Sequence, residues 1–431
     1  MTTSEMFGGL LNNLKVGDKS AQIAARRDTI TKVLNKEFRS TEGCTDHKLM
    51  VGSYGRHTAV RRVSDLDMIY QLPSDLRLSY ATAGGSRRLL TRVRDTLQSR
   101  FPKSDIKVDQ CVVRVEFRSD QFKFEVQPAF ENEDGSFDFP DTSLDGLKTT
   151  RPKEEIEATK RLNDRTGNTM RDLARMARAW KNVHGVAMGG LLIDTLVYRF
   201  LSDDDERGKS TRRSYDALVR DFFGFLASEP NQEYYLALGS NQQVEVKERF
   251  QPKAKKAYEI CLEAIADETE ESARRKWREI FGRVMALRSA EAMRAPNDTE
   301  EFIEEKFPVD IRYALEIDCL VTQDGWRTTQ LRKLLRSDRL LPRRDLEFSI
   351  ARCNVPTPNE VKWKVRNRGT EAVRRNQVRG QIIPPNKGTA LCEHSRFRGD
   401  HFVECYVVKE GIVVARDRIE VPISAGVRLG T

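Results

Sequence analysis

The sequence predicts an α+β protein with a mixed sheet, a helical lobe and a C-terminal β-sandwich. Alternating polar and apolar residues around Asp65 and Asp67 are typical of a short strand. From Pro152 to about Ala295, apolar residues recur at three- and four-residue spacing, as in core-facing helices. From Phe307 on, short alternating segments separated by turn residues indicate a β-sandwich, for which an immunoglobulin-like arrangement is one form. We therefore expect domains at residues 1–155, 156–300 and 308–431, with a linker at Arg294–Thr299.

The first region begins with apolar residues spaced for a long amphipathic helix over Ser20–Arg39. After it, Asp65 and Asp67 alternate with apolar residues, which predicts a half-buried strand. Residues two apart on a strand share a face and lie roughly 7 Å apart. Two such carboxylates can hold a pair of Mg²⁺ ions about 3.5–4 Å apart, the arrangement used for in-line displacement at phosphorus. An acidic strand edge or a Ca²⁺-binding loop would show the same spacing.

A Gly-Ser turn lies a short distance before these aspartates. Gly52 and Ser53 offer backbone N–H groups that a triphosphate can approach without a Cβ in the way. The combination of Gly-Ser, a short spacer, two aspartates and an apolar strand end is typical of a polymerase-β-like nucleotidyltransferase core. His57 lies between the two motifs and could contact substrate, although a loop histidine is usually solvated.

A third carboxylate is expected from a neighbouring strand. Lys107–Phe117 and Gln121–Phe130 are predicted to be two strands joined by a turn at Arg118–Asp120. In the second strand the aromatic residues share one face, so Glu125 points to the other face, toward the aspartates. Glu116 on the preceding strand is the rival. The loop Glu131–Arg151 is expected to end the sheet.

The stretch Gly52–Pro73 resembles the cGAS/DncV-like nucleotidyltransferases (CD-NTases), the cyclic-oligonucleotide synthases of bacterial antiphage signalling. In that family the third metal ligand, usually Asp, precedes a Val-x-Pro, and here Glu125 precedes Val-Gln-Pro. Ala174–Leu201 and Gln232–Val246 extend the likeness. The C-terminal region resembles the adenylyl/guanylyl and SMODS C-terminal sensor (AGS-C) domain.

The resemblance implies an enzyme in which Asp65, Asp67 and Glu125 bind two Mg²⁺ ions, with Mn²⁺ expected to substitute. It implies that two or three NTPs, ATP and also GTP or pyrimidine NTPs, are joined into a cyclic oligonucleotide with release of pyrophosphate. This second messenger would activate a downstream effector in antiviral (CBASS) defence. Two alternatives stay open: a transferase that makes linear 2′–5′ oligonucleotides or extends RNA, and a non-catalytic nucleotide-binding regulator.

Lys181 follows Trp180 near the end of a predicted helix. In the family, a lysine at the matching position contacts the triphosphate, so Lys181 is a nucleotide-binding candidate. An exposed lysine at a helix end is the alternative, and Arg178, one turn earlier, is a weaker candidate.

The C-terminal region carries most of the chain's net positive charge. From Asp310 on there are 23 Lys and Arg against 15 Asp and Glu. The functional interpretation is a surface that faces the phosphates of a nucleotide or a nucleic acid, and the alternative is a solvated face. A zinc site built from Cys392, His394, His401 and Cys405 is disfavoured, because His401 and Cys405 would stand roughly 13 Å apart on one strand.

Composition favours a cytoplasmic protein. No apolar run approaches the length of a membrane span, and no signal peptide is evident. The seven cysteines are scattered and contain no Cys-x-x-Cys pair, which favours reduced thiols.

Overall fold

The computed structural model describes residues 3–17, 19–61, 65–117, 122–202, 214–286, 300–322, 327–337, 340–357 and 359–424. The chain forms two compact units. The first unit consists of Met1–Trp180, Gly189–Val246 and Ala254–Met285, and the second of Lys181–Met188, Lys247–Lys253 and Ala286–Thr431. The boundaries predicted at 155 and 300 stay predictions, and the linker predicted at Arg294–Thr299 lies outside the described residues.

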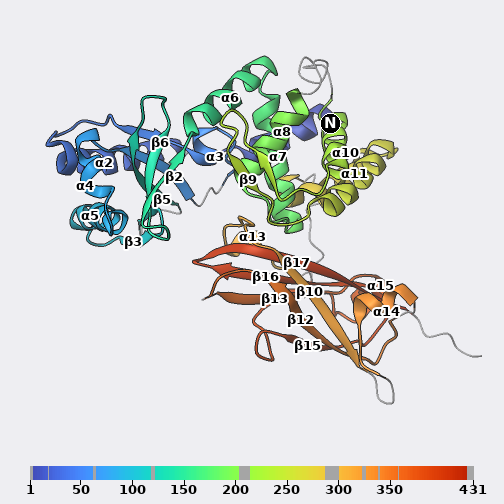
Figure 1. The fold of residues 1–431 in the computed structure, drawn as a ribbon. Helices are drawn as coiled ribbons and strands as arrows, with labels where there is room; N and C mark the ends of the chain where they lie inside the picture. Colours follow the sequence, from blue (N-terminus) through green and yellow to red (C-terminus); the bar gives the residue numbers. More distant parts are fainter. Residues whose placement is uncertain are drawn as a thin grey trace, which may run out of the picture. The chain divides into compact units, whose positions relative to one another are not determined.

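A mixed sheet of seven strands forms part of the first unit (Figure 1). Its main path runs β1 (Lys48–Met50), β2 (Asp65–Gln71), β5 (Lys123–Glu131), β4 (Val112–Glu116), β3 (Asp105–Asp109). The central pair β2 and β5 is parallel, and the other pairs are antiparallel. This agrees with the mixed sheet predicted from the sequence.

The apolar face of this sheet packs against two helices, α2 (Ser20–Arg39) and α5 (Gly85–Arg100). The predicted helix at Ser20–Arg39 is thus confirmed. Leu66, Phe124 and Val126 are fully buried in the shared core. Because side chains alternate along a strand, Asp65, Asp67 and Glu125 project from the opposite face.

Two predictions about the sheet were wrong. The segment Lys107–Phe117 is not one strand, because the chain turns between β3 and β4 at Gln110, where φ is +42°. The predicted loop Glu131–Arg151 contains a hairpin of β6 (Phe137–Asp141) and β7 (Gly146–Thr150), and β6 extends the sheet from β5. The turn predicted at Arg118–Asp120 lies outside the described residues.

Helices dominate the rest of the first unit, as predicted. Among the described residues, the helices that lie wholly within this unit, with two 3-10 turns, are α1 (Thr3–Leu14), α3 (Gly52–Gly55), η1 (Ser74–Leu76), α4 (Arg77–Tyr80), α6 (Pro152–Arg165), α8 (Gly190–Ser202), α10 (Tyr215–Ser228), α12 (Glu270–Phe281) and η2 (Gly282–Val284). Two more, α7 (Thr169–His184) and α11 (Gln251–Ala266), continue into segments of the second unit. The helix predicted to begin near Val244 begins only at Gln251, because Val244 belongs to a short hairpin of β8 (Tyr234–Leu236) and β9 (Gln243–Glu245).

The second unit contains two antiparallel sheets of four strands each. One runs β11 (Thr329–Gln330), β10 (Leu315–Thr322), β12 (Asp345–Cys353), β15 (Leu391–His394), and the other β14 (Arg379–Ile383), β13 (Glu360–Arg366), β16 (Gly399–Lys409), β17 (Ile412–Ile423). Where the structure describes this unit, three short helices accompany the sheets: α13 (Ile303–Lys306), α14 (Leu331–Ser337) and α15 (Thr370–Arg374).

Both sheets contribute to one apolar core in this unit. Ile317 and Phe348 come from the first sheet, and Trp363, Val403 and Val421 come from the second. Two sheets that share a core form a sandwich, so the predicted β-sandwich is confirmed, and its immunoglobulin-like arrangement stays a prediction. In the described parts of the chain, no helix combines the length and the apolar character needed to cross a bilayer.

Candidate active site

The Gly-Ser turn lies directly against the second aspartate. Gly52 adopts the left-handed conformation, with φ at +61°. A Cβ built on Gly52 would lie 1.9 Å from Oδ2 of Asp67, far inside van der Waals contact. The preceding Val51 N–H also donates to the Asp67 carbonyl at 2.9 Å. Glycine is therefore required here both by its backbone conformation and by the space that Asp67 occupies.

Glu125 is the immediate neighbour of Asp67 on the adjacent strand. The two residues are register partners in the parallel pair of β2 and β5, so both side chains leave the same face of the sheet. Burial and the Asp67 carboxylate raise the pKa of Glu125, while Arg114 and Lys123 act in the opposite direction. Glu116, the rival candidate, is exposed and lies opposite Lys123 and Asp105 rather than beside the aspartates.

Asp65 faces a buried lysine. Lys123 is its register partner on β5, and its Nζ lies 3.4 Å from Asp65 Oδ1. The Lys123 side chain is only 8% exposed, so this pair is largely shielded from solvent. A second cation, Arg114, lies 3.3 Å from Glu125. Two of the three carboxylates are thus partly neutralised by cations of the protein itself.

These three residues fit a hard divalent cation by their donor chemistry, since carboxylate oxygens are the ligands that Mg²⁺ prefers. Asp67 and Glu125 are adjacent, and Gly52 leaves the space beside Asp67 free of a side chain. As they stand in the described residues, no three or more His, Cys, Asp or Glu side chains are gathered closely enough to hold a metal ion.

A network of buried ion pairs holds the residue that follows the Gly-Ser turn. Arg56, the residue after α3, donates to Asp194 at 2.8 Å and to Glu155 at 3.1 Å. Arg178 donates to both carboxylate oxygens of Asp194, at 2.7 and 2.9 Å, and Thr58 donates to one of them at 3.0 Å. Burial alone would raise the pKa of Asp194, but the two guanidiniums lower it below its ordinary value. The network links helices α6, α7 and α8 to the turn that adjoins Asp67.

Sequence reasoning missed this network. Arg56 and Asp194 are 138 residues apart, and no local spacing joins them. An Asp inside an otherwise apolar helix, as Asp194 is in α8, was the available signal, because a buried carboxylate requires a cationic partner. Arg178, weighed as a phosphate ligand, is occupied by Asp194 and by the Gly190 carbonyl.

Lys181 belongs to the second unit, at the C-terminal end of α7. Its ammonium group is buried and donates to Asp310 at 2.9 Å, to the Ile311 carbonyl at 2.7 Å and to the Met188 carbonyl at 3.3 Å. These acceptors use all three of its N–H groups. Its contact with a triphosphate stays a prediction, and it requires Lys181 to leave at least one of them. His57 is exposed, and its carbonyl accepts from Arg175 at 2.7 Å.

Three of the residues considered as zinc ligands, Cys405, His394 and His401, each contact groups other than one another. Cys405 is buried in the core of the sandwich. His394 lies 2.8 Å from Asp345, and His401 uses one ring nitrogen to accept the Arg368 N–H and the other to contact the Phe397 carbonyl.

Two family models match the chain. Residues 1–163 match the Second Messenger Oligonucleotide or Dinucleotide Synthetase (SMODS) domain, and residues 297–424 match the Adenylyl/Guanylyl and SMODS C-terminal sensor domain. No curated protein matches the chain.

Solved structures with a similar fold include CdnC from E. coli MS115-1. CdnC with ATP is 14% identical with a TM-score of 0.50, and the match covers 66% of this chain and 99% of that one. CdnC in its complex with HORMA-deltaN is 16% identical with a TM-score of 0.51, covering 65% and 97%. The Bradyrhizobium diazoefficiens CD-NTase CdnG, in complex with GTP, is 10% identical with a TM-score of 0.49, covering 68% and 98%. At such identities the likeness to CdnC shows the fold alone.

Together, the matched domains and the fold define a nucleotidyltransferase core joined to a sensor domain. The chain belongs to the CD-NTase family of nucleotidyltransferases and carries an AGS-C sensor domain.

Proposed function

We propose that this enzyme joins two or three NTPs into a cyclic oligonucleotide by two-metal nucleotidyl transfer. The observation that carries the proposal is the contact between the Gly52 turn and Asp67, with Glu125 as the next side chain on the same face. A triphosphate needs backbone N–H groups that no side chain covers, and two metal ions need neighbouring carboxylates. Gly52 would supply the uncovered backbone next to the neighbouring carboxylates of Asp67 and Glu125.

Asp65, Asp67 and Glu125 would hold two Mg²⁺ ions, with Mn²⁺ as a substitute. When bound, such ions activate an attacking hydroxyl and neutralise the charge of a leaving pyrophosphate. Gly52 and Ser53 would admit the donor triphosphate, because Gly52 carries no side chain above Asp67. The buried Arg56–Asp194 pair would hold the Gly52 turn in place beside Asp67 of β2.

In each transfer, a ribose hydroxyl oxygen of the acceptor forms a bond to the α-phosphorus of the donor. The bond from that phosphorus to the β-phosphate oxygen breaks, and pyrophosphate leaves. The hydroxyl proton passes to a carboxylate of the site.

We further propose that the product is a second messenger of antiviral CBASS defence, which would act on a separate effector. The match to a second-messenger synthetase domain supports this role. ATP is the first substrate to test, because the similar CdnC structure contains ATP, and GTP and pyrimidine NTPs follow.

The proposal is tested by measuring pyrophosphate release from each NTP, and from all four together, with Mg²⁺ or Mn²⁺. We expect release by the unaltered chain and none above background by the double variant Asp65→Asn, Asp67→Asn. The variant should keep its thermal unfolding transition, because asparagine has nearly the size and shape of aspartate and both residues are only half-buried on β2. Release that survives the double substitution would overturn the mechanism, and no release by either protein would favour a non-catalytic regulator.

A further inference from the structure

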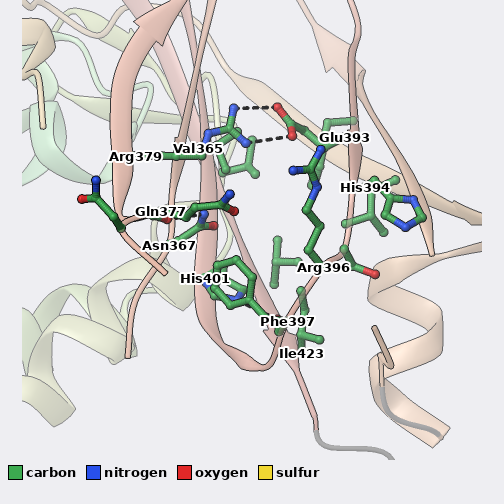
Figure 2. Close-up of a pocket in the computed structure, with 16 residues that line it drawn as sticks. Val365, Asn367, Gln377, Arg379, Glu393, His394, Arg396, Phe397, His401 and Ile423 are labelled. Atoms are coloured by element: carbon green, nitrogen blue, oxygen red, sulfur yellow. Dashed lines mark hydrogen bonds and ion pairs between the residues drawn. The ribbon is translucent and has the colours of Figure 1, made fainter. Parts of the chain in front are cut away.

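A cavity of about 430 Å³ opens between the two sheets of the second unit (Figure 2). Its apolar wall comes from β12 of one sheet, through Leu346 and Phe348, and from the other sheet through Val365, Val403 and Val421. Ligand pockets typically measure about 300–1,000 Å³ and combine an apolar wall with a few polar groups. This volume lies near the lower end of that range, so the cavity suits one compact molecule better than an oligonucleotide.

The charged groups around the cavity leave one positive charge without a counterion. Arg379 and Glu393 neutralise one another through two contacts of 2.8 Å (Figure 2). His394 is paired with Asp345, and burial lowers the pKa of His401, which keeps that ring neutral. Arg396 is exposed and makes no hydrogen bond or ion pair within the described residues. The cavity therefore favours a ligand with a negative charge near Arg396.

Several other arginines of the C-terminal region have carboxylate partners. Arg374 and Arg375 both pair with Glu371, and Arg366 pairs with Glu300. Part of the positive charge predicted to face phosphates is thus already balanced by carboxylates of the same unit.

Carboxamide groups lie across the cavity from Arg396, as Figure 2 shows for Asn367 and Gln377. Asn367 uses its Nδ2 to donate to the Gln377 carbonyl at 2.7 Å, which leaves its Oδ1 as an acceptor. The Gln377 carboxamide makes no hydrogen bond to any described residue. A carboxamide can pair in two-pronged fashion with the donor and acceptor edge of adenine. Phe397 also lines the cavity, where its buried ring packs against His401 at 5.2 Å and against the Arg375 guanidinium at 5.5 Å.

We propose that this cavity binds a single adenine nucleotide, with its base at Gln377 and Asn367 and its phosphate at Arg396. The chemistry required is a planar ring with a donor and acceptor edge joined to an anionic group, which a nucleoside monophosphate supplies. The inference does not rest on the proposed reaction, because the cavity lies wholly within the second unit and needs no turnover.

The test titrates AMP, GMP, CMP, UMP and inorganic phosphate into the full chain by calorimetry, with chelator present to remove divalent cations. We expect AMP to bind about fivefold or more tightly than the other nucleotides, given the worth of one two-pronged base contact. Arg396→Met and Gln377→Ala should each weaken AMP binding about tenfold, as expected for the loss of a charged or buried hydrogen bond. Arg398→Met is the matched control, because Arg398 is also exposed but does not line the cavity.

Hydrogen exchange with AMP then locates the site. Protection is expected at 376–379 and 393–397, and protection confined to 52–67 would place the nucleotide in the active site and overturn the proposal. Equal losses in Arg396→Met and Arg398→Met would show a non-specific basic surface. Phosphate that binds as tightly as AMP, or no binding of any nucleotide, would also contradict it.

Discussion

Gly52 and Asp67 occupy adjoining space: the missing Cβ of Gly52 would lie 1.9 Å from the Asp67 carboxylate. The turn that should admit a triphosphate and the residue that should hold the metal ions are therefore in direct contact. A side chain at position 52 could be accommodated only if the turn or the carboxylate moved.

Gly52→Ala should therefore impair catalysis far more than it impairs folding. A displacement near 1 Å in a catalytic group can cost about 100-fold in rate, and we expect a loss of that size in pyrophosphate release. Gly135→Ala is the matched control, since Gly135 also has a positive φ, +79°, but nothing lies within 4 Å of its added Cβ. Both variants should lose about 1–2 kcal/mol of stability from backbone strain, and Gly52→Ala should lose more, because its Cβ also meets the Asp67 carboxylate. Equal activity in the two variants would contradict this account.

Glu125 should make the requirement for Mg²⁺ depend on pH. Its raised pKa means that it takes up a proton at a higher pH than an ordinary glutamate. The proton and the metal compete for one carboxylate. The Mg²⁺ concentration for half-maximal activity should therefore increase as the pH falls and Glu125 takes up its proton. Glu125→Asp should retain activity and Glu125→Gln should lose it. A Mg²⁺ requirement unchanged between pH 5 and 8 would show that Glu125 is not a ligand.

Asp194→Asn should destabilise the first unit strongly. Asp194 is fully buried between Arg56 and Arg178, and removal of one partner of a buried ion pair costs about 3–5 kcal/mol. The control Asp164→Asn disrupts an exposed pair with Lys160 and should cost at most about 0.5 kcal/mol. Urea unfolding monitored by fluorescence measures the free energy of unfolding of both variants. Similar stabilities of the two variants would show that the network does not anchor the turn.

Glu404 should make the second unit sensitive to acid. Burial would raise its pKa, but Arg416 and Lys364 with a Tyr406 hydrogen bond lower the pKa to about 2. Since the folded-state pKa is below the ordinary value, its stabilisation is present above about pH 4.5. It is then lost as the pH falls toward 2.

Glu404→Gln should therefore remove that pH dependence and lower stability near neutral pH by about 3–5 kcal/mol. The control Glu420→Gln affects an exposed pair with Arg418 and should change little. Thermal unfolding as a function of pH compares the two. A Glu404→Gln protein that keeps the acid transition of the unaltered chain would assign the transition to other carboxylates.

Local pattern explains what the sequence could predict. The two-residue period of strands placed Asp65, Asp67 and Glu125 on one face, and the structure makes Asp67 and Glu125 register partners. Hydrophobic spacing also predicted α2 and the sandwich. The hairpin of β6 and β7 was missed because its strands are short and lie in a Gly- and Asp-rich segment that is typical of loops.

Long-range pairing explains what could not be predicted. Lys181 is joined to Asp310 across 129 residues, and Arg56 to Asp194 across 138. Such partners depend on how helices pack rather than on any local period. The two-residue period of a strand puts Lys123 on the same face as Glu125, but its pairing with Asp65 appears only once β2 and β5 lie in register.

The central claim is that the enzyme makes a cyclic product, and the most direct test is the phosphatase resistance of that product. The full chain is incubated with four radiolabelled NTPs and Mg²⁺ or Mn²⁺, treated with phosphatase and resolved by thin-layer chromatography. We expect a phosphatase-resistant spot that is absent with the Asp65→Asn, Asp67→Asn variant, and omitting each NTP in turn would identify its bases. A ladder of phosphatase-sensitive products would contradict it and indicate linear synthesis.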